Sequence, residues 1–75
     1  MNNTFKKQIR EVVSSLENAS SILEEIRDGE QDRYDNMSDS AQESERGESC
    51  MEGIDTLDET IYGIEDVVST LSDLV

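Results

Sequence analysis

The side chains of this sequence that could do chemistry are mostly carboxylates, and many of them lie in its C-terminal part. Eight acids and no Lys or Arg follow Arg46. If this part is a helix, one outward strip carries most of these acids. This acidic strip consists of Glu48, Glu52, Asp55, Glu59, Asp66 and Asp73, with Tyr62 among them. Carboxylates along a rod imitate the phosphates of a nucleic acid and fit a basic protein groove. The predicted partner-binding residues are Glu52, Asp55, Glu59, Tyr62 and Asp66.

Arg33, Tyr34 and Arg46 form a second candidate site, in a chain with only six basic residues. A guanidinium group binds phosphate through two parallel hydrogen bonds, and an aromatic ring stacks on a base. These three residues could therefore hold an anionic nucleotide. The alternative is local ion pairing with Asp32, Asp35, Glu43 or Glu45, and both interpretations stay open from the sequence.

Other chemistry has little support. Histidine is absent and Cys50 is the only cysteine, so one chain can form neither a Ser-His-Asp or Cys-His arrangement nor a structural zinc site. Asp28, Glu30 and Asp32 alternate like the start of a calcium loop, but Arg33 occupies the position that needs glycine. We expect no enzyme activity, no catalytic residue, and no cofactor or metal site.

The formal charge of −13 restricts the classes of partner that the chain can bind. Such a chain should not bind nucleic acid directly or dock on an anionic membrane, because both need a basic surface. No apolar run approaches the roughly 20 residues of a membrane span, and the single cysteine fits a reducing compartment. The expected location is the cytoplasm.

Apolar residues recur at alternating steps of four and three in two long stretches, which predicts two packed helices. The first stretch contains Phe5, Ile9, Val12, Leu16, Ala19, Leu23 and Ile26. The second contains Cys50, Ile54, Leu57, Ile61, Ile64, Val68, Leu71 and Val75. We predict an all-α, coiled-coil-like antiparallel hairpin in a single domain, 1–75, with helices at about 4–35 and 45–74 and a turn at about 36–44.

Further apolar residues widen both stretches: Val13 and Ile22 in the first, and Met51, Val67 and Leu74 in the second. A wide apolar face suits contact with more than one helix, so we expect two hairpins to dimerise into a four-helix bundle. Antiparallel pairing would place Lys6, Lys7 and Arg10 beside Glu65, Asp66 and Asp73. Of the helical glycines, Gly53 is expected at a close contact and Gly63 at an exposed position.

Residues 34–48, YDNMSDSAQESERGE, resemble a family of uncharacterised small acidic helical proteins from phages and mobile elements of Gram-positive bacteria. The matching residues are Tyr34, Asp35, Asn36, Gln42, Ser44, Glu45, Arg46, Gly47 and Glu48, followed by Met51, Glu52, Ile54, Asp55 and Leu57. Where the family has Pro-Glu and Leu in the turn, this chain has Ser38, Asp39 and Ala41. The resemblance implies a helical hairpin and a phage or mobile-element origin, and small acidic phage proteins often inhibit host factors.

These observations lead to one functional hypothesis and two alternatives. The first is a non-enzymatic, phage-type inhibitor that binds a basic surface of a host nucleic-acid-processing or defence protein, in the host cytoplasm, by nucleic-acid mimicry. The second is sequestration of an anionic nucleotide at Arg33, Tyr34 and Arg46. The third is a purely structural helical bundle.

Overall fold

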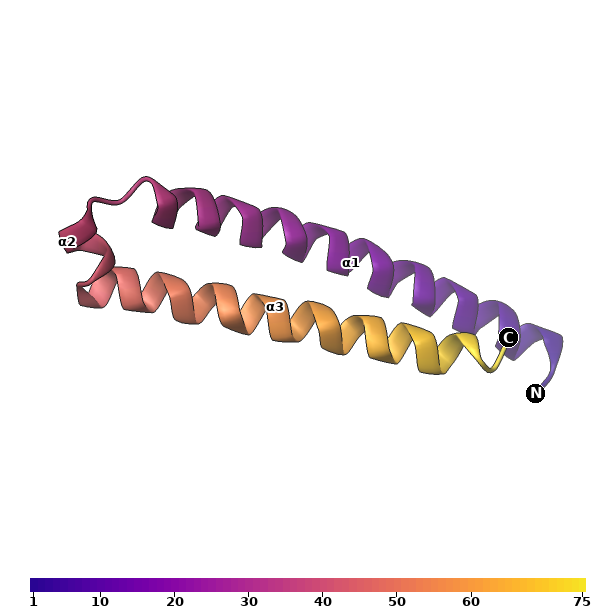
Figure 1. Ribbon diagram of the computed structural model, residues 1–75. Coiled ribbons are helices and arrows are strands. Elements are labelled where there is room, and N and C mark those ends of the chain that lie inside the picture. The colour runs from indigo at the N-terminus through magenta and orange to yellow at the C-terminus, as the bar shows by residue number, and fades with distance from the viewer.

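A computed structural model describes residues 1–75 and contains helices and no strands, as the sequence predicts. Helix α1 spans Asn3–Asp35, the short helix α2 spans Asp39–Gln42, and helix α3 spans Glu45–Ser72. The molecule is elongated, at 58 × 15 × 12 Å. Helices α1 and α3 lie side by side and run in opposite directions, so that α2 lies at one end and both termini at the other (Figure 1).

Side-chain caps mark where α1 begins and ends and where α2 begins. The Asn2 side chain accepts a hydrogen bond from the Phe5 backbone N–H at 2.8 Å, which satisfies a donor in the first turn of α1. The Asn36 amide donates to the Asp32 carbonyl oxygen at 2.8 Å and covers the last turn of the same helix. Ser38 then caps α2 by accepting from the Ala41 N–H at 3.2 Å. The predicted turn therefore contains one further helical turn.

The core lies mainly on α3. Its buried apolar side chains are Cys50, Ile54 and Ile61, which are 2%, 4% and 3% exposed. Leu57, Ile64, Val68 and Leu71, which continue the same face, are half-buried. The stretch predicted for the second helix is therefore confirmed as the contact face, except for Val75, which is exposed.

The face predicted for α1 is partly wrong. Ile9, Leu16 and Leu23 are half-buried as expected. Four other predicted core residues, Phe5, Val12, Ala19 and Ile26, are exposed. The residue that follows each of them is less exposed and lies on the contact face instead: Lys6, Val13, Ser20 and Arg27.

The turn explains this rotation of α1. Tyr34 and Met37 are half-buried at the end of the helix, and the Gln42 amide donates to the Tyr34 carbonyl oxygen at 3.0 Å. With Tyr34 half-buried at this end and held to Gln42 of α2, steps of four and three back along the helix reach Glu30, Arg27, Leu23 and Ser20 rather than Ile26 and Ala19. The turn thus selects one of two possible apolar faces.

The expected close contact at Gly53 is also wrong, because a Cβ atom placed there would meet nothing within 4 Å. The tight position is Gly47, in the first turn of α3. A Cβ atom at Gly47 would overlap the backbone carbonyl of Gln42 and lie 2.6 Å from the Ala41 carbonyl oxygen. Only glycine lets α3 begin this close to α2.

Candidate interaction surface

The acidic strip lies on the outward side of α3. Every predicted partner-binding residue in it is exposed: Glu52, Asp55, Glu59, Tyr62 and Asp66. Tyr62 is 65% exposed, more than any other large apolar or aromatic side chain. The ion pairs of the molecule involve Arg27 and Arg33, and none includes a carboxylate of the strip. The structure therefore leaves these carboxylates free to meet a partner.

The helix sets the spacing of this charge. Glu52, Glu59, Asp66 and Asp73 are seven residues apart and recur on one side at intervals of about 10.5 Å. Within Glu45–Ser72 there are eight acids and one base over about 42 Å, or one acid per about 5 Å. The phosphates of one DNA strand are about 3.4 Å apart. Counted around the whole helix, the acids of α3 are thus about two-thirds as dense as the phosphates of a single nucleic-acid strand.

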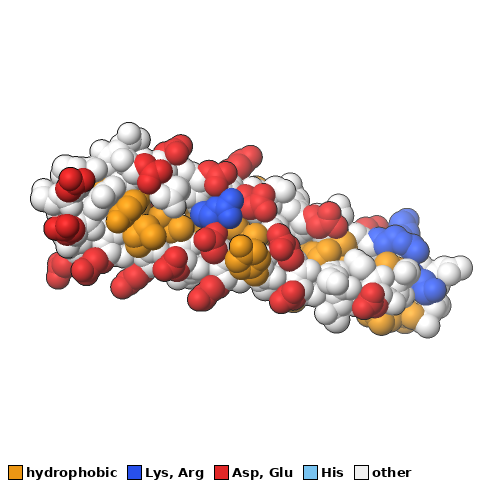
Figure 2. All heavy atoms as spheres, viewed as in Figure 1, with side chains coloured by type: hydrophobic (Ala, Val, Ile, Leu, Met, Phe, Trp, Pro, Cys, Tyr) orange, Lys and Arg blue, Asp and Glu red, His pale blue; other side chains and the backbone are white.

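Acidic side chains also cover much of the face drawn in Figure 2, along both helices, with basic side chains only near its middle and near the end that holds the termini. The predicted neighbours at that end, Lys6, Lys7 and Arg10 with Glu65, Asp66 and Asp73, form no ion pair. Lys6, Lys7 and Arg10 therefore form no ion pair with the acids of α3.

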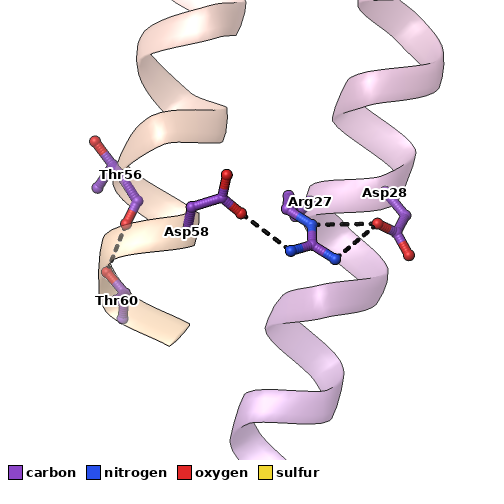
Figure 3. Close-up of polar contacts among 5 residues, drawn as sticks. All are labelled: Arg27, Asp28, Thr56, Asp58 and Thr60. Atoms are coloured by element: carbon purple, nitrogen blue, oxygen red, sulfur yellow. Dashed lines mark hydrogen bonds and ion pairs between the residues drawn. The ribbon is translucent and has the colours of Figure 1, made fainter. Parts of the chain in front are cut away.

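An ion pair that the periodicity did not indicate crosses between the helices at Arg27. Its guanidinium Nη1 donates to Asp58 Oδ1 at 3.1 Å, while Nε and Nη2 donate to Asp28 Oδ1 at 3.2 and 3.1 Å (Figure 3). The hydrogen bond to Asp58, followed by that to Asp28, raises the pKa of Arg27. Arg27 directly follows Ile26, the predicted core residue. Shifting the predicted contact face of the helix by one residue would therefore have placed Arg27 at the contact with α3.

The three residues of the alternative ligand site play different parts. Arg33 Nη2 bonds Glu30 Oε2 at 3.1 Å, and this hydrogen bond raises the pKa of Arg33. Tyr34 is half-buried, and its carbonyl oxygen accepts from Gln42. Arg46 is exposed and has no ion-pair partner. Local ion pairing thus accounts for Arg33, although its partner is Glu30 and not one of the four acids considered from the sequence. Arg46 is left without an ion pair.

One groove lies between α1 and α3, away from these arginines, and has a volume of about 370 Å³. Both helices line it with small, acidic and apolar side chains: Glu17, Ser20, Ser21, Ile64, Glu65, Val68 and Ser69. No group of three potential ligands is arranged to hold a metal ion. None of the helices combines the length and apolar character of a membrane span.

The opposite edge of the helix pair forms a second distinctive surface, which we call the uncharged face. The groove shows that Glu17 and Ser21 of α1 share one edge with Glu65 and Ser69 of α3. The positions on the far side of each contact face therefore share the other edge. They are Phe5, Gln8, Val12, Ser15, Ala19, Ile22, Ile26 and Gly29 on α1, and Ser49, Gly53, Thr56, Thr60, Gly63, Val67, Thr70 and Leu74 on or just beyond α3. All but the half-buried Gly53 are exposed, and none is charged, although 33% of the chain is charged.

Compared with models of protein families, with curated proteins and with solved structures, the chain matches none. The two surfaces, one acidic and one uncharged, are therefore interpreted from their own geometry and chemistry.

Proposed function

We propose that this chain is a non-enzymatic interaction protein whose acidic strip binds a basic surface of another protein. The observation that carries the proposal is the exposed, unpaired row of carboxylates on α3 in a helix with a single base, Arg46. Ordinary protein surfaces mix both signs of charge, because like charges repel at short range along a helix. A one-signed helix is favoured when a basic partner compensates for that repulsion.

The class of partner follows from the spacing. The acidic strip offers a basic groove a row of negative charge along a straight helix, as the phosphates of one nucleic-acid strand do, although the acids are more widely spaced. Tyr62 supplies an aromatic contact within the strip, where base stacking would otherwise occur. The partner is therefore a nucleic-acid-processing or defence protein whose groove is occupied in place of nucleic acid. The resemblance of residues 34–48 to phage proteins makes a bacterial host protein the first candidate.

The test is charge reversal inside the strip. Wild-type protein and the variant Glu59→Lys/Asp66→Lys are immobilised, and basic proteins are captured from a bacterial lysate at low and at high salt. We expect the wild type to retain a nucleic-acid-binding protein at low salt and release it at high salt, because both partners are charged. The double reversal should weaken binding by at least about a hundredfold, since close charge pairs contribute more than 1 kcal/mol each.

The matched control is Glu11→Lys/Glu25→Lys, which makes the same change in net charge on the exposed side of α1. This variant should keep most of the binding, and circular dichroism should show helical spectra for both variants. Equal losses in both would mean that net charge alone attracts the partner. Unchanged binding by Glu59→Lys/Asp66→Lys would refute the acidic strip as the contact.

Nucleotide sequestration is a second candidate, favoured by the exposed, unpaired Arg46. Its test is a thermal-shift screen against linear and cyclic nucleotides. A nucleotide that raises the midpoint of wild type and of Arg10→Ala, but not of Arg46→Ala, would support a site at Arg46. No response to any nucleotide would leave the acidic strip, or a purely structural bundle, as the remaining functions. The predicted dimeric four-helix bundle also stays a proposal, and the uncharged face bears on it.

A further inference from the structure

We propose that the uncharged face binds a second copy of this chain, in an inverted arrangement that places the turn of one copy beside the termini of the other. The inference does not depend on the function of the acidic strip, which lies on another side of α3. It rests on the charge, area and shape of the face and on the small core of the single chain.

The charge of the chain favours this face as the contact between two copies. Two copies that each carry a formal charge of −13 can approach closely only through surfaces that keep their carboxylates apart. With charged residues forming 33% of the chain, roughly one in three positions of any surface would be charged by composition alone. The uncharged face has none along the whole length of its two rows. It is therefore the surface on which a partner with the same strong negative charge meets no opposing acid.

The uncharged face also carries large exposed apolar side chains. Phe5, Val12, Ile22 and Ile26 of α1 are 53%, 50%, 49% and 49% exposed, and Val67 and Leu74 are 48% and 47% exposed. These are most of the large exposed apolar residues of the molecule, and all six lie on the uncharged face. A row at steps of three and four along a helix is the pattern of a helix–helix contact, and here α1 carries a second such row beside its contact with α3.

The area of this face and the small core of the single chain both favour association. Residues 5–29 span about 36 Å of helix, and the pair is 15 Å across. Two copies would cover roughly 1,000 Å² in total, which reaches the lower limit of specific interfaces. Only five of the 75 residues of the single chain are buried, three of them large or medium apolar residues of α3. A chain of this size with so small a core usually gains its stability from association.

Charge distribution and shape favour the inverted arrangement. Residues 1–15 and 61–75, at the end with the termini, contain three bases and four acids, whereas residues 16–60 contain three bases and fifteen acids. Inversion separates the two strongly acidic halves. In this arrangement the α3 helices of the two copies lie against each other and run in opposite directions. Val67 and Leu74 of one copy therefore lie over the small residues Ser49, Gly53 and Thr56 of the other.

The first experiment measures oligomeric state by analytical ultracentrifugation across a concentration series. We expect the wild type and Tyr62→Glu to dimerise, and Ile22→Glu/Val67→Glu to lose at least about a hundredfold in dimer affinity, because four charges enter the contact. Tyr62 is the control, since it is even more exposed than Ile22 and Val67 but lies on the other side of α3. A monomeric wild type at all concentrations, or a dimer unaffected by Ile22→Glu/Val67→Glu, would overturn the proposal.

A second pair of variants avoids any loss of folding. Ser14 and Ser15 are adjacent and both exposed, but only Ser15 lies on the uncharged face. Ser15→Leu should tighten the dimer by about tenfold or more, since each copy then buries one additional leucine. Ser14→Leu should leave the dissociation constant unchanged. Equal effects of the two substitutions would contradict a contact through this face.

Orientation is tested with a spin label on Ser40→Cys, at the turn, where the label is exposed while Cys50 is buried. In the inverted dimer the two labels lie near opposite ends of a molecule that is 58 Å long. Double electron–electron resonance should therefore give a distance between the labels of about 50 Å. A short separation would mean that the turns lie together, and would refute the inverted arrangement.

Discussion

At the scale of single residues, the turn is the most closely specified part of the chain. The side chains of Asn36, Gln42 and Ser44 bond the carbonyl oxygens of Asp32, Tyr34 and Ala41, and Gly47 admits the backbone of α2. Most of these residues belong to the segment 34–48. The shape of the turn is therefore sufficient to explain why these residue types stand there, without a ligand at Arg33 or Arg46.

Gly47 gives the prediction at this scale. Gly47→Ala should lower the free energy of unfolding by about 2 kcal/mol, because the new methyl group would overlap fixed backbone rather than a flexible side chain. Urea unfolding followed by circular dichroism measures the change. The control is Gly29→Ala, where a Cβ meets nothing within 4 Å and alanine should stabilise the helix by about 0.5–1 kcal/mol. A Gly47→Ala protein as stable as wild type would show that α2 is not packed as described.

At the scale of the elements, α1 carries two apolar rows and can present only one of them to α3. The row that contains Val13 and Leu23 faces α3, with the polar residues Ser20, Arg27 and Glu30 among its members. Arg27 is a charged residue in this mostly apolar row, and its charge is paired with Asp58 on α3. The two side chains are 31% and 36% exposed. The ion pair therefore fixes the rotation and register of α1 at a position where hydrophobic packing does not.

This role predicts coupling between Arg27 and Asp58. Arg27→Ala and Asp58→Ala should each lower the melting temperature, and the double variant should lower it by less than the sum, because the second change removes a group that has already lost its partner. Asp28→Ala is the control, since Asp28 is 70% exposed and lies on α1 itself. The raised pKa of Arg27 keeps its guanidinium group charged at neutral pH, and the pair loses this charge only in strong alkali. Additive effects of Arg27→Ala and Asp58→Ala would mean that the pair does not hold the helices together.

At the scale of the whole molecule, charge opposes folding. Nineteen acids and six bases lie on an elongated body with three ion pairs, all partly exposed. Repulsion among unpaired carboxylates is distributed along the full length of both helices, whereas the ion pairs act at two positions on α1. Added salt screens both, and the repulsion is the larger of the two.

We therefore expect the melting temperature to rise with salt. Between low ionic strength and about 0.5 M NaCl, an increase of several degrees is expected, since about 1 kcal/mol corresponds to roughly 4–8 °C for a domain of this size. Circular dichroism at constant protein concentration measures it, because dimerisation would also raise the midpoint. A melting temperature that falls with salt would show that the ion pairs outweigh the repulsion.

The sequence by itself determined the helical class, the face of α3 that packs and the exposure of the acidic strip. Local periodicity is sufficient for these, because an apolar row on one side of a helix leaves its acids on the other. The tertiary structure alone decided which of the two apolar rows of α1 meets α3. That choice depends on how Gln42 and Gly47 set the turn, and on the bond between Arg27 and Asp58, which joins residues 31 positions apart in the chain. The uncharged face follows from the same choice, because rotating α1 by one residue left Phe5, Val12 and Ile26 outside the core.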